Sequence, residues 1–210
     1  MSMITKAYIR CGVCGHRALY TVTTGFYTRG STDMDGRRPK NNRRYELHTM
    51  QKCKKCGFAF ENISRGRPEE LKLVKSAGYR FNEGRPIVNP YSARYYKCGL
   101  VYLGRDEPAN AYFSFLNAAW SCDDIKDFIG AAVCRRRAAE VYKSIDEDEK
   151  RHFVLIHADV LRRIGRFGEA EEIVLHAVIP EKYKKAAQFQ LELIRAKDRK
   201  AHSMREVKDN

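Results

Sequence analysis

The chain has 210 residues, of which 43% are hydrophobic and 31% charged, and its formal net charge is +14 at pH 7. This composition is typical of a folded globular protein and excludes a disordered chain. No apolar run approaches the roughly 20 residues that cross a bilayer, and the first residues lack the apolar core of a secretory signal. We therefore expect a soluble, cytoplasmic protein that is not inserted in a membrane.

The positive charge lies in the first half of the chain. Residues 1–65 hold thirteen Lys or Arg and four Asp or Glu, a net charge of +9, and residues 66–105 add +5. Residues 106–210 hold nineteen of each kind and are neutral. Such an asymmetry concerns partners rather than fold. It leaves a solvated surface, nucleic acid, an acidic protein and anionic lipid as interpretations.

Four of the seven cysteines form two C-x-x-C-G motifs, Cys11 to Gly15 and Cys53 to Gly57. A two-residue spacer lets both thiolates of one turn reach the same ion, and two such turns complete a tetrahedron. The spacing predicts one structural Zn²⁺ held by Cys11, Cys14, Cys53 and Cys56. An iron–sulfur cluster and a pair of redox motifs are the alternatives. The redox reading requires a βαβ pattern, which follows neither motif.

Between and after these motifs the sequence is typical of strands, at about residues 17–24, 44–53 and 57–63. The alternation of apolar and polar residues slips near Thr49, which suggests a bulge. Three antiparallel strands pinned by one ion would form a zinc ribbon over residues 1–66. A piece this small cannot be stable by burial alone, so its folding should depend on the metal.

A loop over residues 27–44 interrupts the ribbon and carries Asp33 and Asp35. It does not match a calcium-binding EF-hand, because Arg37, Arg38 and Arg44 occupy the positions that need an oxygen ligand, glycine and glutamate. A turn whose carboxylates pair with nearby arginines is favoured over a catalytic pair or a second metal site. Residues of this loop and of the second cysteine motif are the expected contacts with an anionic partner: Arg37, Arg38, Lys40, Arg43, Arg44, Lys52, Lys54 and Lys55.

The period of the sequence becomes helical after the ribbon. A short helix at 69–77 and a linker to residue 90 occupy residues 67–90, and a helical domain follows over 91–200. Residues 201–210 are expected to be a flexible tail. The expected helices span about residues 91–103, 109–122, 126–144, 147–164, 167–178 and 181–197.

The helical domain contains an internal repeat of 39 residues. Alanine, phenylalanine and isoleucine recur at this spacing: Ala119/Ala158, Ile125/Ile164, Phe128/Phe167, Ala131/Ala170 and Ala138/Ala177. Small alanines let two helices approach closely, and the aromatic residue after the turn would fill the gap between them. The pattern predicts tetratricopeptide-like helical hairpins, with Lys126 in place of the turn glycine in the first copy. Such arrays display an extended binding surface.

Other chemically distinctive residues have a structural interpretation. Cys98, Cys122, Cys134 and Trp120 are expected in the core. Four tyrosines at near-helical spacing are also expected to pack, although exposed ones beside the basic half would stack nucleic-acid bases: Tyr91, Tyr95, Tyr96 and Tyr102.

Several motifs together resemble a bacterial family catalogued as a domain of unknown function, in which a split zinc ribbon precedes tetratricopeptide-like helices. The resemblance covers residues 11 to about 198. It implies the fold and the metal but no settled activity. Lys54 departs from the proline that the family often has there, which leaves the ligands intact. The matching stretches are CGVCG from Cys11, STDMDGRRP from Ser31, CKKCGF from Cys53, AAWSCDD from Ala118 and ADVLRRIGRF from Ala158.

The sequence thus predicts an α+β protein, a small antiparallel β zinc ribbon followed by a helical-hairpin array. We expect a non-enzymatic adaptor that docks a protein through its helices while the basic half faces an anionic partner. The alternative is an RNA- or DNA-binding protein. An enzyme would have only Asp33, Asp35 and His48 to use, without a nucleophile elbow, phosphate loop or open metal motif. Chelation should unfold the ribbon and spare most helices.

Overall fold

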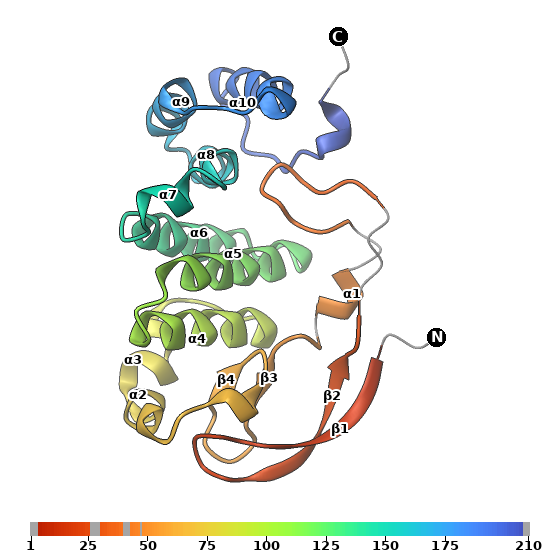
Figure 1. Ribbon diagram of the computed structural model, residues 1–210, viewed down its shortest axis with the longest axis vertical. Coiled ribbons are helices and arrows are strands. Elements are labelled where there is room, and N and C mark those ends of the chain that lie inside the picture. The colour runs from red at the N-terminus through yellow and green to blue at the C-terminus, as the bar shows by residue number, and fades with distance from the viewer. Residues whose placement is uncertain (1–3, 26–29, 40–42, 47, 208–210) are drawn as a thin grey trace. The chain divides into compact units, whose positions relative to one another are not determined.

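The computed structural model describes residues 4–25, 30–39, 43–46 and 48–207 (Figure 1). It confirms the α+β class. The chain forms two compact units, which we call unit 1 (residues 1–28 and 41–138) and unit 2 (residues 29–40 and 139–210). This division differs from the predicted boundaries at 66 and 90. The inserted loop belongs with the C-terminal helices rather than with the ribbon that flanks it.

Among its described residues, unit 1 has two separate pairs of strands. Strand β1 (Ile4–Arg10) pairs antiparallel with β2 (Arg17–Thr23), and β3 (Gln51–Lys52) pairs with β4 (Ala59–Phe60). The predicted strand over 44–53 is wrong except at its end, because α1 (Arg43–Glu46) and a turn at Thr49 occupy its start. The Thr49 hydroxyl donates to the Glu46 carbonyl at 2.8 Å and closes this turn. No bulge is needed there.

The helices of unit 1 that follow the ribbon are α2 (Leu71–Lys75), α3 (Ala77–Arg80), α4 (Pro90–Gly104), α5 (Pro108–Asp124) and the part of α6 (Phe128–Tyr142) that ends at Ala138. Of these, α4 packs directly on strand β4 of the second pair (Figure 1). Helices α4 and α5 approach closely because Gly99 lies against the Phe115 ring, where a β-carbon would sit 2.7 Å away. In the described part of the chain, no helix has both the length and the apolar character needed to span a bilayer.

Hydrogen bonds tie α3 and α4 to the ribbon. The buried Tyr79 hydroxyl accepts from the Ala59 amide at 2.7 Å, and the Tyr102 hydroxyl donates to Glu61 at 2.8 Å. The rings of Tyr102 and Phe60 lie 5.0 Å apart. The ribbon and these helices therefore share one core.

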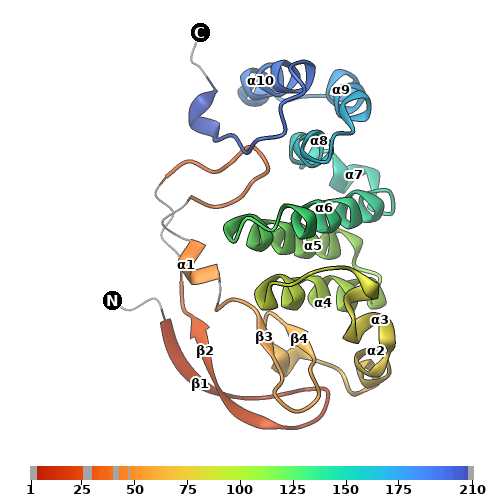
Figure 2. The same ribbon diagram turned by 180° about the vertical axis from the view of Figure 1, so that it is seen from behind.

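Unit 2 contains α7 (Glu147–Lys150), α8 (Val154–Arg163), α9 (Phe167–His176) and α10 (Lys184–Arg195). The predicted helix over 147–164 is divided, because buried Phe153 leaves helical geometry with φ −136°. The inserted loop lies beside the C-terminal segment in both views (Figures 1 and 2). The Met34 amide donates to the His202 carbonyl at 2.8 Å, and the Met204 amide to the Thr32 carbonyl at 2.9 Å. Residues 201–207 are thus held by the loop, unlike the predicted flexible tail.

Four helices end in the same left-handed turn. The residues with positive φ are Asp106 (59°), Lys126 (60°), Gly165 (83°) and Lys197 (53°). After α5, the Lys126 amide donates to the Asp123 carbonyl and the Asp127 amide to the Cys122 carbonyl, which is a Schellman motif. Lys126 and Gly165 are 39 residues apart, so the two copies of the repeat share one turn geometry.

The buried alanines of the repeat confirm part of its predicted packing. Ala119, Ala131, Ala158 and Ala170 are at most 2% exposed. The prediction that the aromatic residue after the turn fills the gap between two helices is wrong for Phe128, which is 71% exposed. Similarity to tetratricopeptide repeats stays a prediction.

Because Lys126 and Gly165 occupy the same left-handed position, substitutions at these two residues should change the free energy of unfolding in opposite directions. We expect Lys126→Gly to raise the free energy of unfolding by about 0.5–1 kcal/mol, because the left-handed penalty of a side chain exceeds the entropy that glycine adds to the unfolded chain. Gly165→Ala should lower it by about 1–2 kcal/mol. Urea denaturation measures both changes. Gly168→Ala is the control, since that α9 position has negative φ and open space, and alanine there should not destabilise.

Candidate metal centre and binding surfaces

The four cysteines of the two motifs converge on one point. Their sulfur atoms all lie within 4.8 Å of one another. The Cys11 and Cys56 sulfurs are 3.8 Å apart, and those of Cys14 and Cys53 are 3.6 Å apart. A tetrahedral ion with metal–sulfur bonds of about 2.3 Å requires sulfur–sulfur edges of about 3.8 Å. The arrangement can therefore hold a metal ion. Two independent redox motifs would not require their four sulfur atoms to lie together.

The two motifs have the same backbone geometry, which explains the glycine after each pair. The Gly15 amide donates to the Cys11 carbonyl at 2.8 Å, and the Gly57 amide to the Cys53 carbonyl at 3.0 Å. Both glycines are left-handed, with φ of 71° and 84°. This turn directs amide N–H groups at the sulfur of the first cysteine in each motif, where they stabilise thiolate.

The first motif is anchored by a close backbone contact. The Gly12 amide donates to the Ile63 carbonyl at 2.9 Å, and a β-carbon on Gly12 would lie 2.0 Å from the Gly66 oxygen. Ile63 and Phe58 are fully buried beside this contact. The sequence analysis did not identify Gly12 or Gly66 as site-forming residues, because their role depends on two segments meeting in space.

The thiols of the cluster differ in acidity. Burial raises the pKa of Cys11 and of Cys56, and the other thiols of the cluster raise them further. Burial also opposes ionisation of Cys53, but hydrogen bonds from the amides of Cys56 and Lys55 and from the thiols of Cys14 and Cys56 together outweigh it and lower the pKa of Cys53 to about 7. Binding of a metal would require all four sulfurs as thiolates and would therefore release their protons. Four sulfurs fill a tetrahedral shell, which leaves no open position for catalysis.

A basic groove lies beside the second motif within unit 1. It has a volume of about 680 Å³. Lys52, Lys54 and Lys55 are exposed there, as predicted for surface cations, and Arg94 joins them from α4. The Arg94 guanidinium lies 4.9 Å from the Tyr91 ring centre. Among its described lining residues there is no carboxylate. We call this surface the basic groove; its other lining residues are Leu19, Tyr20, Thr21, His48, Met50, Gln51, Cys53, Cys56 and Gly57.

The described loop residues that were predicted to contact an anionic partner do not line the basic groove. Arg37 is only 3% exposed, so its side chain belongs to the interior of unit 2, whereas Arg38 is exposed. Arg43 is half-buried and lines a separate hollow of unit 1 with Val88 and Asn89. Lys40 and the side chain of Arg44 lie outside the described residues.

Asp35 has a structural role in the loop. It is 2% exposed, accepts from Arg163 Nη1 at 2.9 Å and from the Arg37 amide at 3.2 Å. Asp33 forms an isolated β-bridge with Ser203. Asp35 thus forms its ion pair with Arg163, which has no local signal in the sequence because it lies 128 residues away. Pairing of the loop carboxylates with the side chains of neighbouring arginines stays a prediction. His48, the third residue of the enzyme hypothesis, lies in unit 1.

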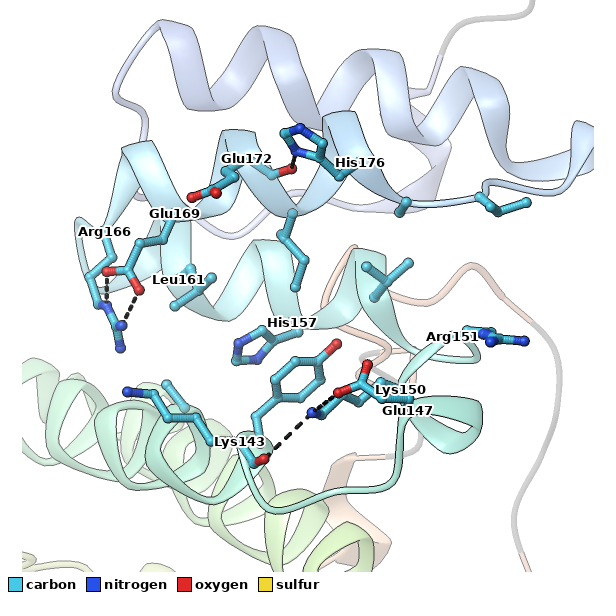
Figure 3. A pocket seen from close by; sticks show the side chains of 16 residues that line it. Lys143, Glu147, Lys150, Arg151, His157, Leu161, Arg166, Glu169, Glu172 and His176 are labelled. Atoms are coloured by element: carbon cyan, nitrogen blue, oxygen red, sulfur yellow. Dashed lines mark hydrogen bonds and ion pairs between the residues drawn. The ribbon is translucent and has the colours of Figure 1, made fainter.

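A second groove lies within unit 2, between the end of α6 and helices α7, α8 and α9 (Figure 3). Its volume is about 720 Å³. At its centre the Tyr142 and His157 rings stack in parallel with centroids 3.5 Å apart. Burial lowers the pKa of His157 to about 3, and the charges of Arg166 and Lys150 lower it further. We call this surface the unit 2 groove.

His157 makes unit 2 sensitive to acid. The folded chain holds this imidazole neutral, whereas the unfolded chain protonates it near pH 6.5. The unfolding free energy should therefore fall as the pH drops from about 6.5 towards 3, by up to about 1.4 kcal/mol per pH unit. Denaturation at several pH values should show a shallower slope for His157→Gln. His152→Gln, an exposed histidine, should keep the wild-type slope.

Comparison of the chain with protein-family models, curated proteins and solved structures finds no match. The family resemblance noted above therefore rests on the motifs themselves.

Proposed function

We propose that the four cysteines bind a single structural Zn²⁺ ion. The tetrahedral sulfur spacing and the closed set of four thiolates support this choice. Native mass spectrometry should give one zinc per chain. An absorption band in the visible range, with iron in the metal analysis, would instead assign the site to iron.

We further propose that the protein is a non-enzymatic nucleic-acid-binding protein, and the basic groove is the observation that carries this proposal. Zn²⁺ with four thiolates has a charge of −2. The four cations of the groove exceed this charge, and no carboxylate among its described lining residues offsets them. The pKa of Lys97 is lowered mainly by burial, and the charge of Lys52 at the groove lowers it further. A polyanion would relieve the repulsion between these cations.

The test is the salt dependence of binding to a fluorescent 20-nucleotide RNA. Affinity should fall steeply with salt, because phosphate contacts release counterions. Lys54→Glu/Lys55→Glu should weaken binding and reduce the slope of log K against log salt by about 1.4. Lys72→Glu/Lys75→Glu changes the net charge equally on exposed α2 and should leave the slope unchanged. Equal loss in both variants, or no binding to RNA or DNA at 50 mM salt, would refute the groove.

A second candidate function, protein docking, is favoured by the unit 2 groove. Lys143, Lys150 and Arg151 line it together with Glu169 and Glu172 of α9, around the apolar residues of α8 and α9 (Figure 3). This combination fits a peptide segment that inserts an apolar side chain between charged flanks. It corresponds to the adaptor predicted from the helical repeat.

Variants of two exposed apolar residues test this candidate. Val178 is 92% exposed and lines the groove, whereas Leu175 is 57% exposed and does not. A protein that copurifies from the native host should be lost with Val178→Asp and kept with Leu175→Asp. Retention in both variants would exclude the groove as its binding site.

A further inference from the structure

The β1–β2 hairpin has one face of unusual composition. From Lys6 to Arg10 and from Arg17 to Val22 exposure alternates, so that Ala7, Ile9 and Tyr20 turn to one side with Ala18 and Val22 and are half-buried or buried. On the other side the pair Ile4 and Thr23 is half-buried, and the six residues that follow along the two strands form an exposed surface. We call it the hairpin face; it consists of Lys6, Tyr8, Arg10, Arg17, Leu19 and Thr21.

The hairpin face places an open aromatic ring among cations. Tyr8 is 66% exposed and pairs across the strands with Leu19, which is 40% exposed. The Arg17 guanidinium lies 5.3 Å from the centre of the Tyr8 ring, which leaves most of the ring open. Neither strand contains a carboxylate. A packing role does not account for an exposed aromatic residue between three cations.

The hairpin face is continuous with the basic groove, because Leu19 and Thr21 belong to both. A linear ligand that lies along the groove would therefore meet the hairpin face at its edge. The cations of the hairpin face would attract a polyanion with evenly spaced charges. The exposed ring of Tyr8 would stack on a flat ring of that ligand.

We propose that the hairpin face is a base-stacking platform for single-stranded nucleic acid, which rests on the nucleic-acid-binding function proposed above. Tyr8 stacks on one base, while Lys6, Arg10 and Arg17 contact the flanking phosphates. A single strand offers free base faces, which a duplex hides within its own stack. An acidic peptide would use the cations but not the ring. An anionic membrane would use the cations, but the apolar area of Tyr8 and Leu19 is small for insertion.

The test compares Tyr8→Ala with two probes, a 20-nucleotide oligo(U) and a 20-unit abasic strand that has phosphates without bases. Stacking on an aromatic side chain is worth a factor of about 5–150 in affinity per base. Tyr8→Ala should weaken oligo(U) binding by such a factor, leave the abasic strand unaffected and leave the salt slope unchanged. Tyr8→Phe keeps the ring and should bind like the wild type. Phe81→Ala is the matched control, since Phe81 is a 69% exposed aromatic residue of unit 1 outside the face.

The outcomes separate this inference from the function on which it rests. If no nucleic acid binds, both fail. If Lys54→Glu/Lys55→Glu reduces the salt slope but Tyr8→Ala matches the wild type, the groove stands and the platform is refuted. Equal weakening of oligo(U) and abasic binding would mean that Tyr8 only maintains the fold. Tighter binding to vesicles with 30% phosphatidylserine or to poly-glutamate than to oligo(U), lost in Tyr8→Ala, would assign the face to a membrane or an acidic protein.

Discussion

Removal of the metal should unfold unit 1 and leave unit 2 folded. Structural zinc sites contribute about 10–16 kcal/mol of apparent binding free energy, which equals or exceeds the whole stability of a typical domain. The sequence alone suggested that most helices would survive. The structure changes this expectation for α3, α4 and α5, because Tyr79 and Tyr102 bond to the ribbon and α4 packs on β4.

Hydrogen exchange on the full chain measures this effect segment by segment. With a strong zinc chelator, or in Cys53→Ser, amides of β1 to β4 and of α4 and α5 should lose protection, while those of α8 to α10 retain it. Cys98→Ala, at a buried cysteine outside the cluster, should keep one metal per chain and near-normal protection. Retained protection in α4 and α5 without metal would show that these helices fold independently of the ribbon.

Loss of Arg162 should be the most damaging single change in unit 2. Its side chain is fully buried, and Nη2 donates to Asp159 at 2.7 Å and to the Lys200 carbonyl at 2.9 Å. Nη1 donates to the Asp198 carbonyl. Arg162→Met would leave the Asp159 carboxylate buried without its cation and release the segment after α10. We expect a loss of about 3–5 kcal/mol in unfolding free energy.

The pH dependence identifies the mechanism of this loss. Burial raises the pKa of Asp159, and the Arg162 guanidinium partly offsets that rise. Without Arg162 the folded-state pKa rises further above the unfolded value, so the deficit of the variant should shrink as the pH falls and Asp159 is protonated. Asp159→Leu/Arg162→Met should be less destabilised than Arg162→Met alone, since no unpaired charge remains. A deficit independent of pH would attribute the loss to packing instead.

Features with local signals were predictable. The two cysteine turns were, because both cysteines of a pair and their glycine lie within five residues and form the whole turn. Most helix ends were too, since Pro90, Pro108 and the turn residues mark them within a few positions, whereas the break before Phe153 was not. The exposed lysines of the second motif follow from the same local pattern.

Features that depend on distant contacts were not predictable. Strand β1 was not predicted, because residues 7–9 are consecutive apolar residues and do not alternate with polar ones. The unit boundary within α6 has no local signal. Nothing near Asp35 indicates Arg163, and the Arg37 side chain looks like any surface cation until the loop meets α8.

The route of the chain also orders events during synthesis. Asp35 leaves the ribosome 128 residues before Arg163, which at about 5–20 residues per second is a delay of about 6–26 s. The hydrogen bonds of Thr32 and Met34 form later still, because their partners Met204 and His202 are synthesised after Arg163. The loop between the two cysteine motifs therefore lacks these partners until residue 204 has been synthesised. A chain that stops before Arg163 would lack the cation that pairs with Asp35.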